Sequence, residues 1–504
     1  MHEEGKHLDK PDGVNFDDRY RFGERILIAV GFQQCHEAPK RGGENIMDEQ
    51  VYIANGAGFS GDRFDAAVPL VAHLASCKGP RYLMFEVLAE RTIALAQNAK
   101  VKDPGAGYSP YLENYLRPIL RDVQKHQIKI VSNMGAANPA AAAGHIHRLA
   151  DEMGLAPFNI AVLTGDDVTS YLDRQAIMEA QTMEGTSLAG RDLCSANAYL
   201  GGDAVAKALD TGADIVLVGR TTDSALVLGP LIHEFGWQEG ALDKLAAGTI
   251  CGHLLECGGQ VTGAYFADPG FKDVPDLAGV GFPLAEVRAD GQFTITKADG
   301  TGGCVTKATV TEQLLYEMHD PSCYVVPDVS ADVTSMELIE EAPNRIKVVG
   351  IKGHARPEQL KVTVCVDGGY MAEAEMSYAG LNALKRAKLA GEVVLSRMRA
   401  SGYNADIRMD ILGAYSVLDG GRAEQMEGKM LPFDGDYRVR LALISEERET
   451  AQLLCDELQH LYCSGPAGGG GYRAAVTEQM ASASILLDRA LIAPHIHAEV
   501  IPHD

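Results

Sequence analysis

Short apolar runs alternate with helical patterns between about residue 50 and residue 235. The clearest run is Ile215-Val216-Leu217-Val218, which lies between Gly212 and Gly219. A β-branched run of this length between glycines predicts a strand buried on both faces, as in a parallel sheet. Similar runs, each followed by a helical pattern, occur at residues 51–54, 82–86, 128–133 and 158–165. Four or five such units predict an α/β fold with one doubly wound, mainly parallel sheet and right-handed crossovers.

The pattern changes from about Asp328, where long alternating strands replace the buried runs. Strands are predicted at residues 344–353, 358–378, 406–418 and 436–445, and helices at 381–402 and 446–462. This order predicts a C-terminal α+β domain whose helices cover one face of an antiparallel sheet. We therefore divide the chain into an N-terminal extension (1–45), an α/β domain (46–325), an α+β domain ending in a glycine-rich loop (326–488) and a histidine-containing tail (489–504). Disorder or an interface is the expected state of that tail.

Polar side chains follow the predicted strands at their carboxyl ends, where ligands bind in open α/β sheets. Arg220 and Asp223 come directly after the strand at 215–218. The same edge of the sheet would collect Glu86, Asn133, Asp166, Asp167 and Asn197. We predict substrate-binding roles for Arg220, Asn133, Asn197 and Asp166. In the alternative interpretation, Asp223 caps the following helix and pairs with Arg220.

A glycine-rich turn joins the first predicted strand to its helix. Gly56, Gly58 and Gly61 form a G-x-G-x-x-G pattern, which lets backbone approach a phosphate at a helix N-terminus. We predict that these glycines bind an anionic group. A dinucleotide, with Glu86 on its ribose, is one candidate, and a carboxylate or a CoA phosphate is another. Because Asp62 would repel a phosphate, a tight turn without a ligand is a further alternative.

A third candidate group lies on a predicted helix. His253, Glu256 and Cys257 stand at spacings i, i+3 and i+4, so one helix face presents an imidazole, a carboxylate and a thiol. The imidazole of His253 would supply the base or the positive field that thiolate chemistry at Cys257 needs. The alternative is a buried cysteine beside a hydrogen-bonded histidine. His145 and His147 do not share a helix face, and no metal site is predicted.

Composition and charge narrow the classes of partner. The chain of 504 residues has a formal net charge of −24, which disfavours nucleic acid and anionic membranes as partners. Its ten cysteines form no CxxC pair, which favours reduced thiols. The polar N-terminus lacks the apolar segment of a signal peptide, and no apolar run is long enough to span a membrane. A cytoplasmic protein is therefore expected.

Several motifs together resemble the acyclic terpene utilization AtuA family. They span about residues 50 to 488 and read, in order, GAGFSGDRFDAA, KDPGAGY, SNMGAANPAA, VGRTTDSALVLGPLIHEFGW, GTICGHLLECGGQVTGAYFADPG, TGGCVTKATVTEQLLYE and SGPAGGGG. One departure is that Ser132, Met134 and Ala136-Ala137 stand where the resemblance leads us to expect a turn more like Thr-Asn-Ala-Gly-Gly, so the resemblance supports Asn133 and Asn138 best as polar site residues. Another is that some relatives carry a small C-terminal domain after the glycine turn, so here the role of that domain would come from a small separate subunit or be absent.

The resemblance implies a catabolic enzyme of a terpene-like or related degradation pathway, acting on a carboxylic acid or its acyl-CoA thioester. Acid/base chemistry by a lyase or hydratase needs a base beside a carbonyl and a group that stabilises the enolate. We predict Asp223, His253, Glu256 and Glu90 as the catalytic residues. The alternatives are a non-catalytic subunit that binds a CoA-linked intermediate and an NAD(P)-dependent oxidoreductase. The sequence identifies no cofactor, and a homo-oligomer is expected.

Overall fold

The computed structural model describes residues 50–403, 406–414 and 435–503. The predicted N-terminal extension (1–45) and the end of the strand predicted at 406–418 lie outside the described residues. By their contacts, the described residues belong to one unit. None of the described helices is both long and apolar enough to cross a membrane.

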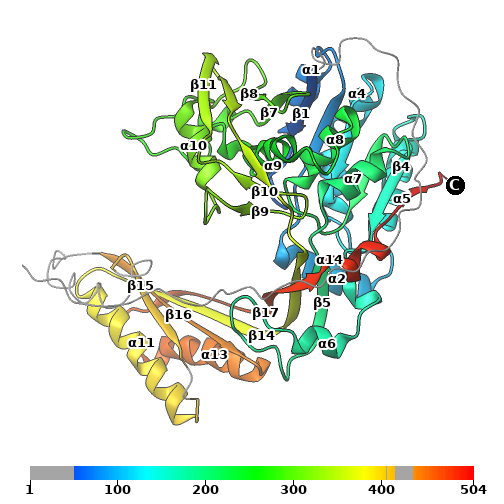
Figure 1. Ribbon diagram of the computed structural model, residues 1–504. Helices are drawn as coiled ribbons and strands as arrows, with labels where there is room; N and C mark the ends of the chain where they lie inside the picture. Colours follow the sequence, from blue (N-terminus) through cyan, green and yellow to red (C-terminus); the bar gives the residue numbers. More distant parts are fainter. Residues whose placement is uncertain (1–49, 404–405, 415–434, 504) are drawn as a thin grey trace, which may run out of the picture. The chain divides into compact units, whose positions relative to one another are not determined.

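Within the described residues, the largest sheet has ten strands in the order β11-β12-β8-β7-β1-β2-β3-β6-β4-β18 (Figure 1). Its centre is parallel and consists of β1 (Gln50–Asn55), β2 (Arg81–Phe85), β3 (Lys129–Ser132), β6 (Ile215–Val218) and β4 (Ile160–Thr164). All four residues of β6 are buried, as the apolar run predicts. The predicted parallel sheet is therefore confirmed.

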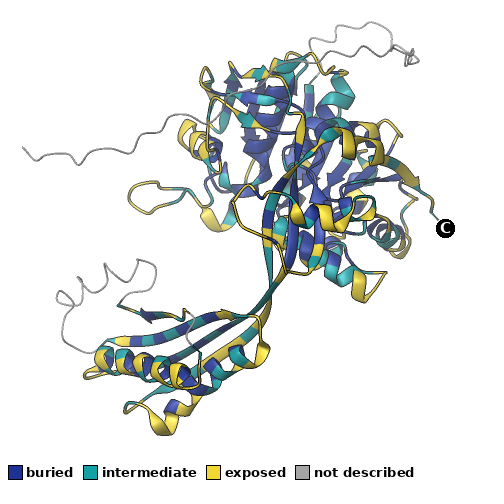
Figure 2. Cartoon of the chain, turned by 60° about the horizontal axis from the view of Figure 1, so that its bottom comes forward, coloured by how far each residue is buried: buried dark blue, intermediate teal, exposed yellow. Residues whose placement is uncertain are grey.

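Helices cover both faces of this sheet, which makes it doubly wound. Alternate residues of β6 belong to two different apolar cores: Val216 and Val218 to one, Ile215 and Leu217 to the other. The first core includes residues of α7 (Gly202–Leu209), α8 (Ala225–Phe235), α9 (Leu242–Glu256) and α10 (Lys307–Leu315). The second includes residues of α1 (Ala67–Leu74), α3 (Leu112–Leu116), α4 (Leu120–Lys125) and α5 (Pro139–Glu152). In Figure 2 the central strands are dark blue, whereas the outer helix faces are yellow.

Antiparallel strands extend the sheet at both edges. One edge is formed by β7 (Pro283–Arg288), β8 (Phe293–Lys297), β12 (Arg345–Val349) and β11 (Glu337–Ala342), and the other by β18 (His497–Ile501). The first sheet thus continues beyond the boundary predicted at residues 325/326. The expected disorder of the tail is wrong for its described part, since β18 pairs along β4. Without β18, β4 would expose an unpaired row of backbone groups.

The predicted antiparallel sheet is also confirmed. It contains β15 (Arg408–Leu412), β16 (Asp436–Ser445), β14 (Gln359–Ala379) and β17 (Gly470–Asp488), and β5 (Leu193–Ala198) pairs with β14. Its core packs against α11 (Ala383–Ala400) and α13 (Arg448–Ser464). The remaining elements are α2 (Glu90–Lys102), α6 (Arg174–Glu179), α14 (Arg489–Ile492) and a small sheet of β9 (Tyr324–Val325), β10 (Ser330–Asp332) and β13 (Lys352–His354). The sequence pattern did not predict β5, whose polar residues Ser195 and Asn197 interrupt its apolar run.

Candidate functional site

The turn between β6 and α8 carries a buried guanidinium and a half-exposed carboxylate. Arg220 Nη2 lies 2.6 Å from Asp223 Oδ1, and Arg220 Nη1 donates to the carbonyl oxygen of Leu88. The side chain of Arg220 is 3% exposed, whereas that of Asp223 is 35% exposed. Since two of its nitrogens are occupied inside the protein, the geometry favours Arg220 as a positioning residue for Asp223. The predicted direct contact between Arg220 and a substrate is not favoured.

Asp166 is hydrogen-bonded to the backbone of this turn, and Asn197 is hydrogen-bonded to Asp166. Asp166 Oδ2 accepts hydrogen bonds from the backbone N–H of Arg220 at 2.9 Å and from Asn197 Nδ2 at 2.9 Å. Burial raises the pKa of Asp166 to about 6. A Cβ at Gly219 would lie 2.6 Å from Asp166 Oδ2, so only glycine permits this approach. Both side chains are buried, at 6% and 1% exposure. Their bonds favour a supporting role over the predicted contact with substrate.

Glu86 and Asn133 connect the ends of β2 and β3. Asn133 Nδ2 donates to Glu86 Oε1 at 2.8 Å, and Asn133 Oδ1 accepts from the N–H of Val87 at 2.8 Å. Burial, together with the charge of Asp223, raises the pKa of Glu86 well above its usual value. A carboxyl held protonated in this way lowers the negative charge around Asp223.

Glu90 belongs to a network that only the tertiary structure assembles. Tyr199 donates its hydroxyl to Glu90 Oε1, and Lys361 Nζ lies 3.4 Å from the same oxygen. The guanidinium carbon of Arg220 lies 4.3 Å from the centre of the Tyr199 ring. Although burial favours the neutral form, the bond from Tyr199 and the charge of Arg220 lower the pKa of Glu90 to about 2. Tyr199 and Lys361 were missed by sequence reasoning, because β5 and β14 bring them to the site from distant segments.

His253 and Glu256, near the end of α9, form a buried pair. His253 Nδ1 lies 2.9 Å from Glu256 Oε1, and His253 Nε2 lies 3.0 Å from the carbonyl oxygen of Leu314. Because that carbonyl can only accept, Nε2 carries a proton and the contact with Glu256 needs a second one. Burial raises the pKa of Glu256 to about 7, against the opposing effect of His253, and the charge of Asp223 adds to this rise. Glu256 Oε2 has no hydrogen-bond partner.

The surroundings of Cys257 disfavour a thiolate. Burial, reinforced by the charge of Glu256, raises the pKa of its thiol far above its usual value. Cys257 is half-buried, and the structure favours the alternative of a structural cysteine over nucleophilic chemistry. Tyr324 is a further neighbour that sequence reasoning missed, with its ring centre 5.1 Å from that of His253.

The glycine-rich turn packs against the end of α9. A Cβ at Gly58 would lie 2.5 Å from the backbone of Cys257, and the N–H of Gly58 donates to Asp62 Oδ2 at 2.9 Å. The following helix, α1, begins only at Ala67. A side chain of the protein thus occupies the position that a phosphate would take at Gly58. The geometry favours the tight-turn alternative, while anion binding at Gly56, Gly58 and Gly61 stays a prediction.

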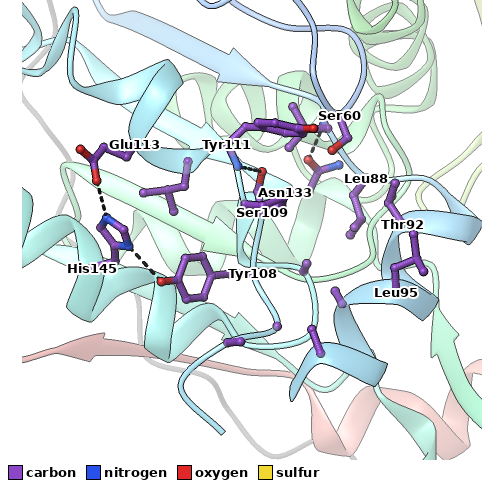
Figure 3. Close-up of a pocket in the computed structure, with 18 of the residues that line it drawn as sticks. Ser60, Leu88, Thr92, Leu95, Tyr108, Ser109, Tyr111, Glu113, Asn133 and His145 are labelled. Carbon is purple, nitrogen blue, oxygen red and sulfur yellow. Dashed lines mark hydrogen bonds and ion pairs between the residues drawn. The ribbon is translucent and has the colours of Figure 1, made fainter. Parts of the chain in front are cut away.

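A pocket of about 640 Å³ lies beside this site (Figure 3). Leu88 and Asn133 contribute to its wall, so it adjoins the segment that Arg220 holds. The remaining wall comes from α2, the loop at 103–111, α3 and α5, together with Ser60, Val87 and Ala136. Asp223, His253 and Glu256 are not among the lining residues. Among the described residues, no group of three or more histidine, cysteine, aspartate or glutamate side chains is arranged to hold a metal ion.

Comparison with known proteins supports the resemblance seen in the motifs. The family model described as acyclic terpene utilisation family protein AtuA matches residues 51–498. The chain belongs to the AtuA family. No curated protein and no solved structure matches it. Membership of the AtuA family associates the chain with acyclic terpene utilisation, and the Arg220–Asp223 turn and the His253–Glu256 pair both lie in the matched region.

Proposed function

We propose that this AtuA-family chain is a catabolic enzyme that acts on a carboxylic acid or its acyl-CoA thioester as a lyase or hydratase. One observation carries the proposal. Asp223 is a partly exposed carboxylate that Arg220 holds from inside the protein, and burial raises its pKa against the opposing charge of Arg220. A carboxylate that is both accessible and more basic than usual suits general acid/base catalysis.

In the proposed dehydration, Asp223 removes a proton from the carbon beside the carbonyl. The C–H bond breaks, and its electron pair passes into the carbonyl group as an enolate. When the enolate collapses, the β-hydroxyl leaves with the proton that Asp223 now returns, so that water is released and Asp223 is regenerated. Hydration is the reverse sequence. Either direction needs one carboxyl that alternates between base and acid.

The other charged groups support this cycle. Glu90 stays ionised at neutral pH because its pKa is low. The His253–Glu256 pair holds a proton, and the negative charge of Asp223 favours this proton because it raises the pKa of Glu256. We assign to Glu90 and to this pair the role of setting the charge around Asp223. A CoA-binding partner subunit and an NAD(P)-dependent oxidoreductase are the alternative functions that the following tests distinguish.

A thermal-shift screen separates these outcomes. The full chain is tested with CoA, short 3-hydroxyacyl-CoA and enoyl-CoA thioesters, the free acids and NAD(P). A ligand at a hundred times its dissociation constant adds about 2.7 kcal/mol to the free energy of unfolding. Stabilisation by thioesters or acids supports the proposal, stabilisation by NAD(P) alone supports the oxidoreductase, and a silent panel contradicts acid or thioester binding.

Turnover then tests the catalytic role. Asp223→Asn should lower the rate of interconversion of 3-hydroxyacyl-CoA and enoyl-CoA by about 10²–10⁴-fold while ligand stabilisation persists. Asp436→Asn, at an exposed position on β16, is the matched control and should keep the rate. Stabilisation by thioesters without turnover in the unaltered chain would favour the partner subunit. The expected homo-oligomer is checked by light scattering of the purified chain.

A further inference from the structure

Three side chains in the wall of the pocket form a chain of hydrogen bonds. Tyr108 Oη lies 2.9 Å from His145 Nδ1, and His145 Nε2 lies 3.1 Å from Glu113 Oε2 (Figure 3). Hydrogen bonds from Arg117 and His145 lower the pKa of Glu113, so its carboxylate is ionised and can only accept. His145 Nε2 therefore carries the proton, and in the neutral imidazole Nδ1 accepts from the Tyr108 hydroxyl. For the neutral imidazole, both hydrogen bonds thus run in one direction, from Tyr108 through His145 to Glu113.

This direction determines what Tyr108 offers to the pocket. Its proton is committed to His145, so the free capacity of Oη is that of an acceptor. The oxygen is also made more electron-rich, because hydrogen bonds in a chain polarise one another. A ligand that meets Tyr108 must therefore present a hydrogen-bond donor, such as a hydroxyl group.

The remaining wall is largely apolar. One face of α2 points into the pocket with Leu95, Ala96 and Ala99, and Leu95 is 47% exposed. Leu88 and Ala136 belong to a small apolar cluster that is separate from the larger cores. A volume of about 640 Å³ lies within the range of small-molecule sites, which is roughly 300–1,000 Å³. An apolar molecule bound in the pocket would cover the exposed side chain of Leu95.

The charges of the lining residues further limit the class of ligand that the pocket can bind. Asp103 and Glu113 line the pocket together with one guanidinium, that of Arg91. Arg117 pairs with Glu113, so the carboxylate of Asp103 and the acceptor oxygen of Tyr108 are the groups that disfavour an anionic head group. A neutral hydroxyl satisfies Tyr108 without this repulsion.

We propose that this pocket binds a largely apolar molecule bearing a hydroxyl group, which donates a hydrogen bond to Tyr108 as held by His145 and Glu113. The site does not include Asp223, so the proposal goes beyond the proposed function and stands or falls separately from it.

Calorimetric titration of the full chain with matched probes tests the site. The probes are 1-octanol, its methyl ether, which lacks the donor, and octanoate, which carries the charge. We expect 1-octanol to bind about 5–10-fold more tightly than the ether, as one hydrogen bond predicts, and more tightly than octanoate. Equal affinities for alcohol and ether, tighter binding of octanoate, or no binding of any probe would overturn the proposal.

Variants locate the effect. Tyr108→Phe removes only the hydroxyl and should reduce the affinity for 1-octanol to that for the ether. Leu95→Arg places a charge in the hollow from a partly exposed position and should weaken both probes more than about 10-fold. Tyr265→Phe, at a tyrosine that is 83% exposed and outside the pocket, is the control and should change neither affinity. Circular dichroism verifies folding of each variant.

An alcohol preference that survives in Tyr108→Phe would contradict the assignment. Asp223→Asn should bind 1-octanol as tightly as the unaltered chain does. The binding result therefore does not depend on whether the proposed function is correct.

Discussion

Arg220 and Asp223 are joined by a 2.6 Å contact in which the cation is almost fully buried and the anion is open to solvent on one side. The guanidinium also donates to the carbonyl oxygen of Leu88 and lies over the ring of Tyr199. Arg220 therefore connects the turn after β6 with the segment after β2 and with β5. Asp223 owes both its position and its charge state to a residue three places earlier in the chain.

Removal of this cation should destabilise the fold. Arg220→Met leaves the buried carbonyl of Leu88 and the carboxylate of Asp223 without a partner, so we expect a loss of about 3 kcal/mol in the free energy of unfolding. The value stands at the low end of the range for buried pairs because Asp223 is a third exposed. Denaturant unfolding measures the loss. Arg220→Met combined with Asp223→Asn should recover part of it, and strictly additive losses would contradict coupling between the two residues.

Stability should fall as the pH rises through the range where Asp166 titrates. Its pKa is about 6 in the folded protein, against a usual value of 3.8, because the carboxyl is buried. The folded state thus keeps a proton that the unfolded chain releases. The contribution of Asp166 to stability is fully present below about pH 4 and is lost by about pH 6, a change of about 3 kcal/mol. Asp166→Asn should flatten this part of the curve. Burial also raises the pKa of Asp328 to about 6. The variant Asp328→Asn should therefore flatten the same part of the curve. An unchanged slope in both variants would show that neither carboxyl titrates in this way.

Ala136 adopts a backbone conformation that suits glycine. Its φ is +44° and its ψ is −120°, in the turn after β3. This is the position at which the resemblance to the AtuA family leads us to expect glycine. Ala136→Gly should therefore raise the free energy of unfolding by about 1 kcal/mol. Ala137→Gly makes the same chemical change where φ is not positive and should lower it by about 0.5–1 kcal/mol. Melting temperatures compare the two, and a destabilised Ala136→Gly would contradict the argument.

Gly58 should tolerate no side chain. A methyl group there would meet the backbone of Cys257 at 2.5 Å and of Gly258 at 2.6 Å, neither of which can turn aside as a side chain does. We expect Gly58→Ala to cost at least about 2 kcal/mol, as overpacking of a core does. Gly105→Ala, whose nearest contact is the mobile end of Asp103 at 3.3 Å, is the control and should cost much less. A stable Gly58→Ala that loses binding of an anionic ligand would instead support the predicted anion site.

Local patterns determined much of the architecture. The apolar run at Ile215–Val218 predicts β6, and the alternation from residue 358 onward predicts β14. The pattern did not predict β5 as a strand of the second sheet, because its partner β14 lies more than 150 residues further along the chain. Likewise, β18 forms because β4 has a free edge, which no local pattern of the tail reveals.

The candidate site divides in the same way. The spacing of Arg220 and Asp223, and of His253 and Glu256, determined two contacts by itself, since residues three apart in a turn or helix are neighbours. Only the tertiary structure decided that Tyr199 and Lys361 surround Glu90, and that Tyr108, His145 and Glu113 meet in one pocket. It also decided which carboxyls are buried, and hence their pKa values. Sequence specifies short-range geometry through backbone dihedral angles, whereas burial and long-range contacts depend on how the whole chain packs.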